Sequence, residues 1–242
     1  MNAPFQPSLP AVRLINLALP EEARRIDAFV GDHPDGTPFH RSVWLHAVAR
    51  GTGNPALALV AERRGELTGY LPLSDVSSPI FGRMLASSGF AVGGGVLAAS
   101  DADAEALFAG AEELATRHAI TEIELRGGSL PVGRTGWRIR NQSHCGFVLP
   151  LAGDDEAQLT AIPRKQRAEV RKGLTNPLEV TAGQAESDRV AHYAVYGESV
   201  RNLGTPVFPR SLFDAVLDLF GEAADILTVW HEGAPVASVL SL

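Results

Sequence analysis

Short apolar runs alternate with amphipathic stretches along the chain, and this pattern predicts a mixed α/β fold. Helical spacing is clearest over residues 101–118, where Leu107, Ala111 and Leu114 share one face. Two pairs of apolar runs flank short glycine turns, and they predict hairpins over 56–73 and 226–242. Further strands are predicted at 11–17, 81–97 (a glycine-rich stretch), 121–126, 144–149 and 178–182. Further helices are predicted at 42–50, 164–172, 187–203 and 209–220, and one more begins at residue 20.

The two predicted hairpins belong to a longer internal repeat. A shift of 168 residues superposes Thr37-Pro38 on Thr205-Pro206 and Gly65 on Gly233. Each copy then reads as a Thr-Pro turn, a helix, a glycine, a strand, a glycine turn and a second strand. Sequence identity between the copies is low, so chance similarity is the alternative. The repeat predicts that residues 37–73 and 205–241 share one element order.

A polar joint at 152–155 separates two predicted domains, 1–152 and 153–242. The first copy of the repeat continues into further strands and a long helix, whereas the second copy stops within the apolar run 235–242. We therefore expect the second domain to be incomplete. We also expect the strand over 235–242 to have one unpaired edge and a more exposed apolar face than its counterpart over 67–73.

Composition narrows the functional classes. The chain has 242 residues, is 45% hydrophobic and carries a net charge of −7, which disfavours a general nucleic-acid binder. A single cysteine, Cys145, excludes an intramolecular disulfide and a cysteine-based zinc site, and the seven histidines are dispersed, so we expect no metal. No signal peptide or membrane span is recognised, so a cytoplasmic location is expected.

One segment is strongly basic although the chain as a whole is acidic. Residues 162–172 hold five basic residues and one acid, and they contain the only two lysines of the chain. On a helix, Arg164, Arg167 and Arg171 share one face, and guanidinium groups in that arrangement suit phosphate oxygens. The adjacent face carries Lys165 and Lys172. A solvated amphipathic helix is the alternative interpretation.

A second segment gathers polar side chains near a predicted helix end. Tyr196 and Asn202 lie at helical spacing before Gly204, with Arg201 beside them, and together they form a candidate pocket rim. Glu198 is a weak candidate for a catalytic base, and the catalytic residues otherwise stay unknown. Ordinary capping and turn chemistry explains these residues equally well.

Three consecutive glycines, Gly93, Gly94 and Gly95, allow backbone amides to approach a ligand closely. They do not fit the dinucleotide fingerprint or the P-loop pattern. A bulge or a sheet corner is therefore the favoured interpretation of this stretch.

The runs 162–172, 198–210 and 233–241 resemble FemAB-like proteins of the branch associated with exosortase (PEP-CTERM) systems. Weaker likenesses at Pro38-Phe39-His40 and 69–73 extend this resemblance over nearly the whole chain. The resemblance implies an α/β (α+β mixed sheet) fold with tandem acetyltransferase-like (GNAT) domains. Since family members continue past residue 242, it also implies that residues 1–242 alone are inactive.

In function, the resemblance implies an N-acyl or aminoacyl transferase acting on an activated cell-envelope or exopolysaccharide precursor by direct amine attack. The partners would be a phosphate-bearing envelope precursor and, as donor, acyl-CoA or charged tRNA, with no covalently bound cofactor and no DNA. A GNAT domain binds coenzyme A on a glycine-rich loop between its fourth strand and the next helix. The stretch at Gly93–Gly95 lacks the Arg/Gln-x-x-Gly-x-Gly/Ala pattern of that loop. Two alternatives remain: a non-catalytic GNAT-like module that binds an anionic glycan precursor or partner protein, and an RNA-binding accessory protein, which the acidic remainder disfavours.

Overall fold

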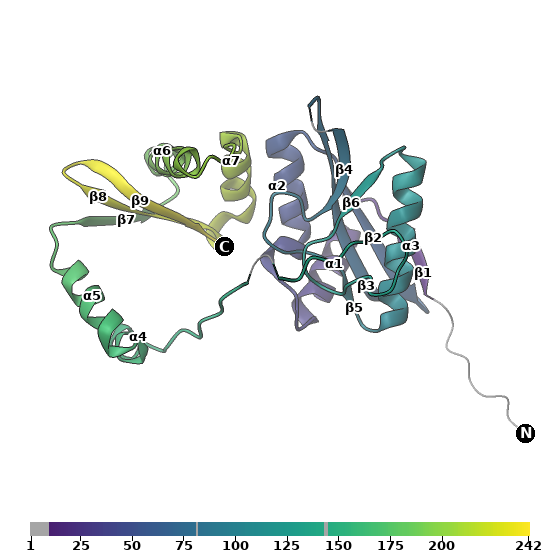
Figure 1. The fold of residues 1–242 in the computed structure, drawn as a ribbon, viewed down its shortest axis with the longest axis horizontal. Coiled ribbons are helices and arrows are strands. Elements are labelled where there is room, and N and C mark those ends of the chain that lie inside the picture. The colour runs from purple at the N-terminus through teal and green to yellow at the C-terminus, as the bar shows by residue number, and fades with distance from the viewer. Residues whose placement is uncertain (1–9, 81, 143–144) are drawn as a thin grey trace, which may run out of the picture. The chain divides into compact units, whose positions relative to one another are not determined.

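The structure is a computed structural model that describes residues 10–80, 82–142 and 145–242. It is mixed α/β and divides into two compact units (Figure 1). The first unit holds the chain up to Ile139 together with Phe208–Ala224, and the second holds Arg140–Val207 together with Asp225–Ser241. The predicted boundaries 1–152 and 153–242 stay a prediction.

A six-stranded sheet forms the first unit, with the strand order β1-β2-β3-β4-β6 and β5 beside β3. Its neighbouring strands are antiparallel except for β4 and β6, which run parallel. The strands are β1 (Ala11–Leu14), β2 (Ala56–Arg63), β3 (Glu66–Ser78), β4 (Gly82–Ser87), β5 (Leu97–Ala98) and β6 (Glu122–Glu124).

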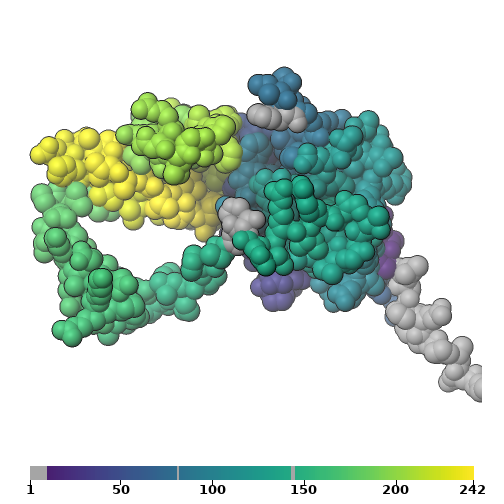
Figure 2. Space-filling view, viewed as in Figure 1, coloured from purple at the N-terminus to yellow at the C-terminus, as the bar shows by residue number. Residues whose placement is uncertain are grey.

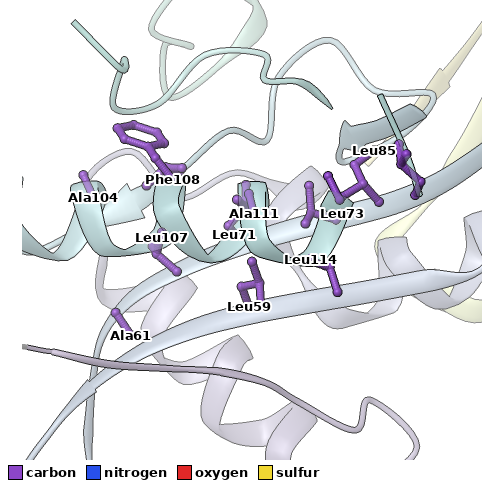
Figure 3. Close-up of a cluster of buried hydrophobic side chains, with 13 residues drawn as sticks. Leu59, Ala61, Leu71, Leu73, Leu85, Ala104, Leu107, Phe108, Ala111 and Leu114 are labelled. Carbon is purple, nitrogen blue, oxygen red and sulfur yellow. The ribbon is translucent and has the colours of Figure 1, made fainter. Parts of the chain in front are cut away.

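Helices cover this sheet and bury its two faces. The helix α3 (Asp101–Arg117) begins where the Ser100 side chain accepts a hydrogen bond from the amide of Asp103, and it buries Leu107 against the strands (Figure 3). The helices α1 (Pro20–Asp32) and α2 (Ser42–Thr52) are joined through the 3-10 turn η1 (Pro38–His40). A second core cluster includes Ile26 of α1, Leu45 of α2, and Val60 and Tyr70 of the strands.

A three-stranded antiparallel sheet forms the second unit in the order β7-β8-β9. The helix α6 (Glu186–Asn202) packs on β8 and β9 and buries Ala191 and His192. The strands are β7 (Glu179–Gly183), β8 (Asp225–His231) and β9 (Ala234–Ser241), and the other elements are α4 (Asp155–Ala161), α5 (Arg164–Leu174) and the 3-10 turn η2 (Gly221–Ala223), which belongs to the first unit.

The helix α7 (Arg210–Phe220) lies late in the sequence but packs in the first unit, where it contacts α2 (Figure 1). Its buried stripe includes Leu212, Val216 and Leu217. Arg50 of α2 and Asp218 of α7, which stand 168 positions apart, form an ion pair at 2.9 Å.

Strand pairing confirms the predicted repeat and extends it. Ala11 pairs with Glu62 in the first sheet, and Glu179 pairs with Trp230 in the second, each partner 168 residues later. All four β1–β2 pairs recur in β7–β8 with this shift, and all seven β8–β9 pairs recur in β2–β3. The helices α1 and α6 also overlap under the same shift. The two halves therefore share one element order and one pairing register.

The irregular positions recur as well. A register shift lies between Ala61 and Glu62 in the first hairpin and between Val229 and Trp230 in the second. Each hairpin turns through a residue pair with positive φ, at 52° and 86° for Arg64-Gly65 and at 51° and 78° for Glu232-Gly233. Positive φ at both central residues matches the right-handed twist of the flanking strands. A bulge and a turn at equivalent positions are independent signs of duplication.

Three sequence-based expectations change or gain support. The strand predicted over 144–149 is wrong for the described residues 145–149, which form no strand and expose Phe147 almost completely. Over its described residues, 82–97, the stretch predicted at 81–97 divides into β4, a loop that holds the three consecutive glycines, and β5. The expectation for 235–242 is confirmed, since β9 pairs only with β8 among the described residues and exposes Val239 by 50%, whereas Leu71 of β3 is fully buried.

Candidate functional site

The basic residues of the 162–172 segment all lie on α5. Arg164, Lys165, Arg171 and Lys172 are exposed, and none of the described residues of α5 is buried. These four residues fall within a third of a turn around the helix axis, because successive residues advance by about 100°. Figure 2 shows α4 and α5 in green at the molecular surface. The structure thus places four cations on one side of an exposed helix.

Arg167 has a different environment from the other four cations. Its guanidinium donates to the carbonyl oxygen of Thr160 at 3.0 Å and to that of Ile162 at 3.0 and 3.2 Å. These carbonyls lie at the end of α4, where helix backbone acceptors lack partners within the helix. Arg167 therefore holds α4 against the start of α5, and its part in substrate binding stays a prediction.

The second group of candidate residues lies near the end of α6. Tyr196 is half-buried, and its ring lies 6.1 Å from that of Tyr193 between centroids. Glu198, Arg201 and Asn202 are exposed. The helix ends at Asn202, and Gly204 follows with a φ of 68°. The structure brings these residues onto one helix that rests on β8 and β9, and their functional roles stay predictions.

The glycine-rich loop lies between β4 and β5 in the first unit. The strands β4 and β6 pair only from Met84 to Ala86, and the chain then leaves the ladder. Gly95 packs directly on the next loop, because a Cβ added there would lie 1.8 Å from the carbonyl oxygen of Gly127. Gly95 therefore has no room for a side chain, because the backbone of the next loop lies against it.

His40 fastens this loop to the turn between α1 and α2. The amide of Thr37 donates to His40 Nδ1 at 3.2 Å, so Nδ1 carries no proton and Nε2–H donates to the carbonyl oxygen of Gly95 at 3.2 Å. The hydroxyl of Ser88 adds bonds to the carbonyl oxygens of Phe39 at 2.7 Å and Gly94 at 3.2 Å. Burial lowers the pKa of His40 to about 4, and the bond to Gly95 opposes that shift.

A polar cluster in the second unit was missed by the sequence analysis. His192 of α6 places Nδ1 2.9 Å from the hydroxyl oxygen of Ser238, which also lies 3.1 Å from the hydroxyl of Thr228. Burial lowers the pKa of His192. The equivalent strand positions in the first unit are Tyr70 and Val60. The 168-residue shift found in the sequence already aligns these positions, but the contact of Ser238 with His192 becomes visible only in the structure.

The described ranges contain neither a metal cluster nor a membrane-spanning helix. No group of three or more His, Cys, Asp or Glu side chains in those ranges is placed to hold a metal ion. None of the helices within them combines the length and the apolarity needed to cross a membrane. Cys145 is exposed.

The comparisons with known proteins give a fold but no family. No family model and no curated protein matches the chain. FemX matches with a TM-score of 0.58 and 19% identity over 90% of this chain. A tandem GNAT protein from the clavulanic acid biosynthesis pathway gives a TM-score of 0.46 at 13% identity, covering 96% of this chain and 74% of its own. A ribosomal-protein-alanine N-acetyltransferase from Brucella melitensis biovar Abortus 2308 gives 0.38 at 16% identity, covering 60% of this chain and 100% of its own.

The first of these likenesses supports the FemAB-like and GNAT-like fold that the sequence motifs imply. It extends over both units, and the chain spans 57% of the length of FemX. The described chain therefore has a mixed α/β, GNAT-like fold similar to that of FemX.

Proposed function

We propose that this chain forms part of an N-acyl or aminoacyl transferase that acts on an activated cell-envelope or exopolysaccharide precursor. The likeness to FemX over 90% of the chain supports a transferase of this kind. The common register of the two halves supports a tandem GNAT arrangement. The resemblance of the basic segment to the exosortase-associated branch supports an exopolysaccharide precursor as the acceptor.

The proposed reaction is a direct transfer. The amine nitrogen of the acceptor forms a bond to the carbonyl carbon of the donor, the ester C–O or thioester C–S bond breaks, and the amine proton passes to a base. Positioning of the two substrates supplies much of the rate in such a reaction. Glu198 is the weak candidate for the base.

The exposed cations of α5 are the observation that carries the proposal. Four positive side chains on one side of a helix, in a chain with a net charge of −7, favour a phosphate-bearing ligand at that helix. The acceptor precursor is the ligand we assign to α5. The phosphate backbone of a charged tRNA is the alternative, with Tyr196, Arg201 and Asn202 as further binding residues.

The glycine-rich loop at Gly93–Gly95 in the first unit is relevant to the identity of the acyl donor. A coenzyme A pyrophosphate binds backbone amides of a loop with the family's glycine-rich pattern, and the stretch at Gly93–Gly95 lacks that pattern. This departure from the pattern is why we favour aminoacyl-tRNA over acyl-CoA as the donor if the donor site lies in the first unit. The same observation favours the alternative in which this unit is a non-catalytic binding module. Both donors are cytoplasmic molecules, so the proposal places the reaction in the cytoplasm.

A binding measurement tests the assignment of α5. The full chain is titrated calorimetrically with a nucleoside-diphosphate sugar, and the variant changes Arg164, Lys165, Arg171 and Lys172 to Gln while keeping Arg167, which holds the α4 end. We expect affinity to fall at least about tenfold, because several charge-assisted hydrogen bonds to phosphate are lost. The loss should shrink as salt is raised, since the remaining attraction is screened.

A charge-matched control separates local binding from net charge. The control variant changes Arg24, Arg117, Arg138 and Arg140, which are exposed elsewhere, to Gln. It should keep wild-type affinity. Equal losses of affinity in the two variants, or unchanged affinity in the α5 variant, would show that α5 is an ordinary solvated surface helix. Either result would remove the main support for the proposal.

A further inference from the structure

A surface pocket lies in the first unit, where α1 ends and the chain turns through η1 into α2. Its volume is about 370 Å³, at the lower end of the range of about 300–1,000 Å³ that is usual for ligand pockets. Four of its lining residues have polar or charged side chains, namely Asp27, His33, Thr37 and Arg41. None of the lining residues belongs to α5 or to the loop at Gly93–Gly95, so this pocket is separate from the candidate site described above.

Asp27 holds an oriented negative charge on one wall of the pocket. Its two carboxylate oxygens accept hydrogen bonds from the amide and the hydroxyl of Ser42, each at 2.8 Å. Both donors are uncharged, and Asp27 forms no ion pair within the described residues. Burial raises the pKa of Tyr70, and the charge of Asp27 raises it further, so this neighbouring hydroxyl stays neutral. The charge of Asp27 is therefore fixed in place but not neutralised.

Arg41 supplies a positive charge to the same pocket. It stands between η1 and α2, and its amide donates to the carbonyl oxygen of Pro38 at 3.2 Å, which fixes its backbone. Arg41 is exposed, and its guanidinium forms no ion pair in the part of the chain that the structure describes. Because Asp27 and Arg41 line one pocket without pairing, two opposite charges remain available to a ligand.

The other walls add no further charge and leave room for a small side chain. His33 Nδ1 accepts a hydrogen bond from the amide of Asp35 at 3.2 Å, so Nδ1 carries no proton and the ring is neutral. Val30 is buried and gives the pocket an apolar wall. Gly31 also lines the pocket, and a Cβ added there would meet no atom within 4 Å.

We propose that this pocket binds a small zwitterion of the α-amino-acid type, with its ammonium group at Asp27 and its carboxylate at Arg41. A guanidinium binds a carboxylate through two parallel N–H bonds, and hydrogen bonds between ionised partners are the strong ones. A purely anionic ligand is repelled by Asp27, and a purely cationic one is repelled by Arg41. Val30 and the space beside Gly31 accommodate the side chain of the ligand. This site does not rest on the proposed transferase function.

Titration of the full chain with L-alanine, followed through the amide NMR signals, tests the ligand class. We expect saturable shifts at the amides of Gly31 and Thr37, which line the pocket. Ethylamine and propionate each keep only one charged group of alanine, and each should bind at least about tenfold more weakly. The absence of shifts at these amides would overturn the proposal, and so would an affinity for either analogue equal to that for alanine.

Variants of the two charged residues test the assigned contacts. Arg41→Gln should raise the dissociation constant for alanine at least about tenfold, because the bidentate bond to the carboxylate is lost. The matched control is Arg24→Gln, which changes an exposed arginine of α1 that does not line this pocket, and it should keep the wild-type value.

Asp27→Asn is the second variant, because it keeps an oxygen acceptor for the Ser42 amide while removing the negative charge. It should also raise the dissociation constant at least about tenfold, and thermal unfolding checks that the chain remains folded. An unchanged dissociation constant in Arg41→Gln, or equal changes in Arg41→Gln and Arg24→Gln, would overturn the proposal whatever the stability of Asp27→Asn.

Discussion

At the residue scale, His40 explains how a glycine-rich loop acquires one conformation. Its two ring nitrogens bond the Thr37 amide and the Gly95 carbonyl, which lie far apart in sequence. Both bonds need the neutral ring, because Nδ1 must accept while Nε2 donates. Its motif Thr37-Pro38-Phe39-His40 was visible in the sequence, but nothing there indicates the partner at Gly95.

This arrangement predicts a dependence of stability on pH. The pKa of His40 is about 4 in the folded chain against 6.5 for the free side chain, so the unfolded state binds the proton first. The contribution to the free energy of unfolding is complete above pH 6.5 and is lost as the pH falls towards 4. Its full size is on the order of 3 kcal/mol.

Denaturant unfolding at several pH values measures this contribution. In His40→Gln the loss of stability between these pH limits should be smaller than in the wild type, because the titrating group is gone. The control His231→Gln changes an exposed histidine and should keep the wild-type slope. Parallel pH profiles for wild type and His40→Gln would contradict the assignment of a neutral, buried ring.

At the element scale, the packing of α7 on α2 depends on a close backbone approach. Gly51 lies where a Cβ would be 2.5 Å from Leu212 Cα and 2.7 Å from the carbonyl oxygen of Ser211. The Ser211 hydroxyl also donates to the carbonyl oxygen of Gly51. No side chain larger than hydrogen fits between the helices without displacing α7.

The variant Gly51→Ala should therefore lower the free energy of unfolding by about 1–3 kcal/mol, the range for overpacking a close contact. Gly31→Ala is the matched control, because Gly31 is also in a helix and has no atom within 4 Å of an added Cβ. It should be neutral or stabilising by about 0.5–1 kcal/mol through helix propensity. Thermal unfolding of both variants measures these changes in stability. Equal changes would contradict a close approach of α7 to Gly51.

The helices and strands also show which parts of the fold can be predicted from sequence patterns. Periodicity and turn residues located the hairpins, α3, α5, α6 and α7 within a few residues, because local spacing determines these elements. The pattern at 144–149 was apolar without forming a strand over its described residues, since pairing depends on a neighbour that sequence cannot identify. The amphipathic face of α7 was visible, but its partner α2 was not. The four cations of α5 were predicted, whereas the bond of Arg167 to the α4 end requires coordinates.

At the scale of the whole molecule, the 168-residue repeat is the strongest feature. Two β-α-α-β-β segments share strand register, bulge and turn. Their surroundings differ, since β3 belongs to a wider sheet than β9 does and α7 packs in the first unit. The copies also differ in polarity, with His192 and Ser238 where the first copy has Arg24 and Tyr70. The two copies therefore share backbone geometry but differ in the side chains packed on their strands.

We propose above that the FemX-like fold of this chain holds a phosphate-bearing ligand on α5. A crystal structure of the full chain with a bound nucleoside-diphosphate sugar tests it most directly. The account predicts phosphate oxygens within hydrogen-bond distance of at least two of Arg164, Lys165, Arg171 and Lys172. A diphosphate bound at the Gly93–Gly95 loop, with α5 left free of ligand, would contradict it.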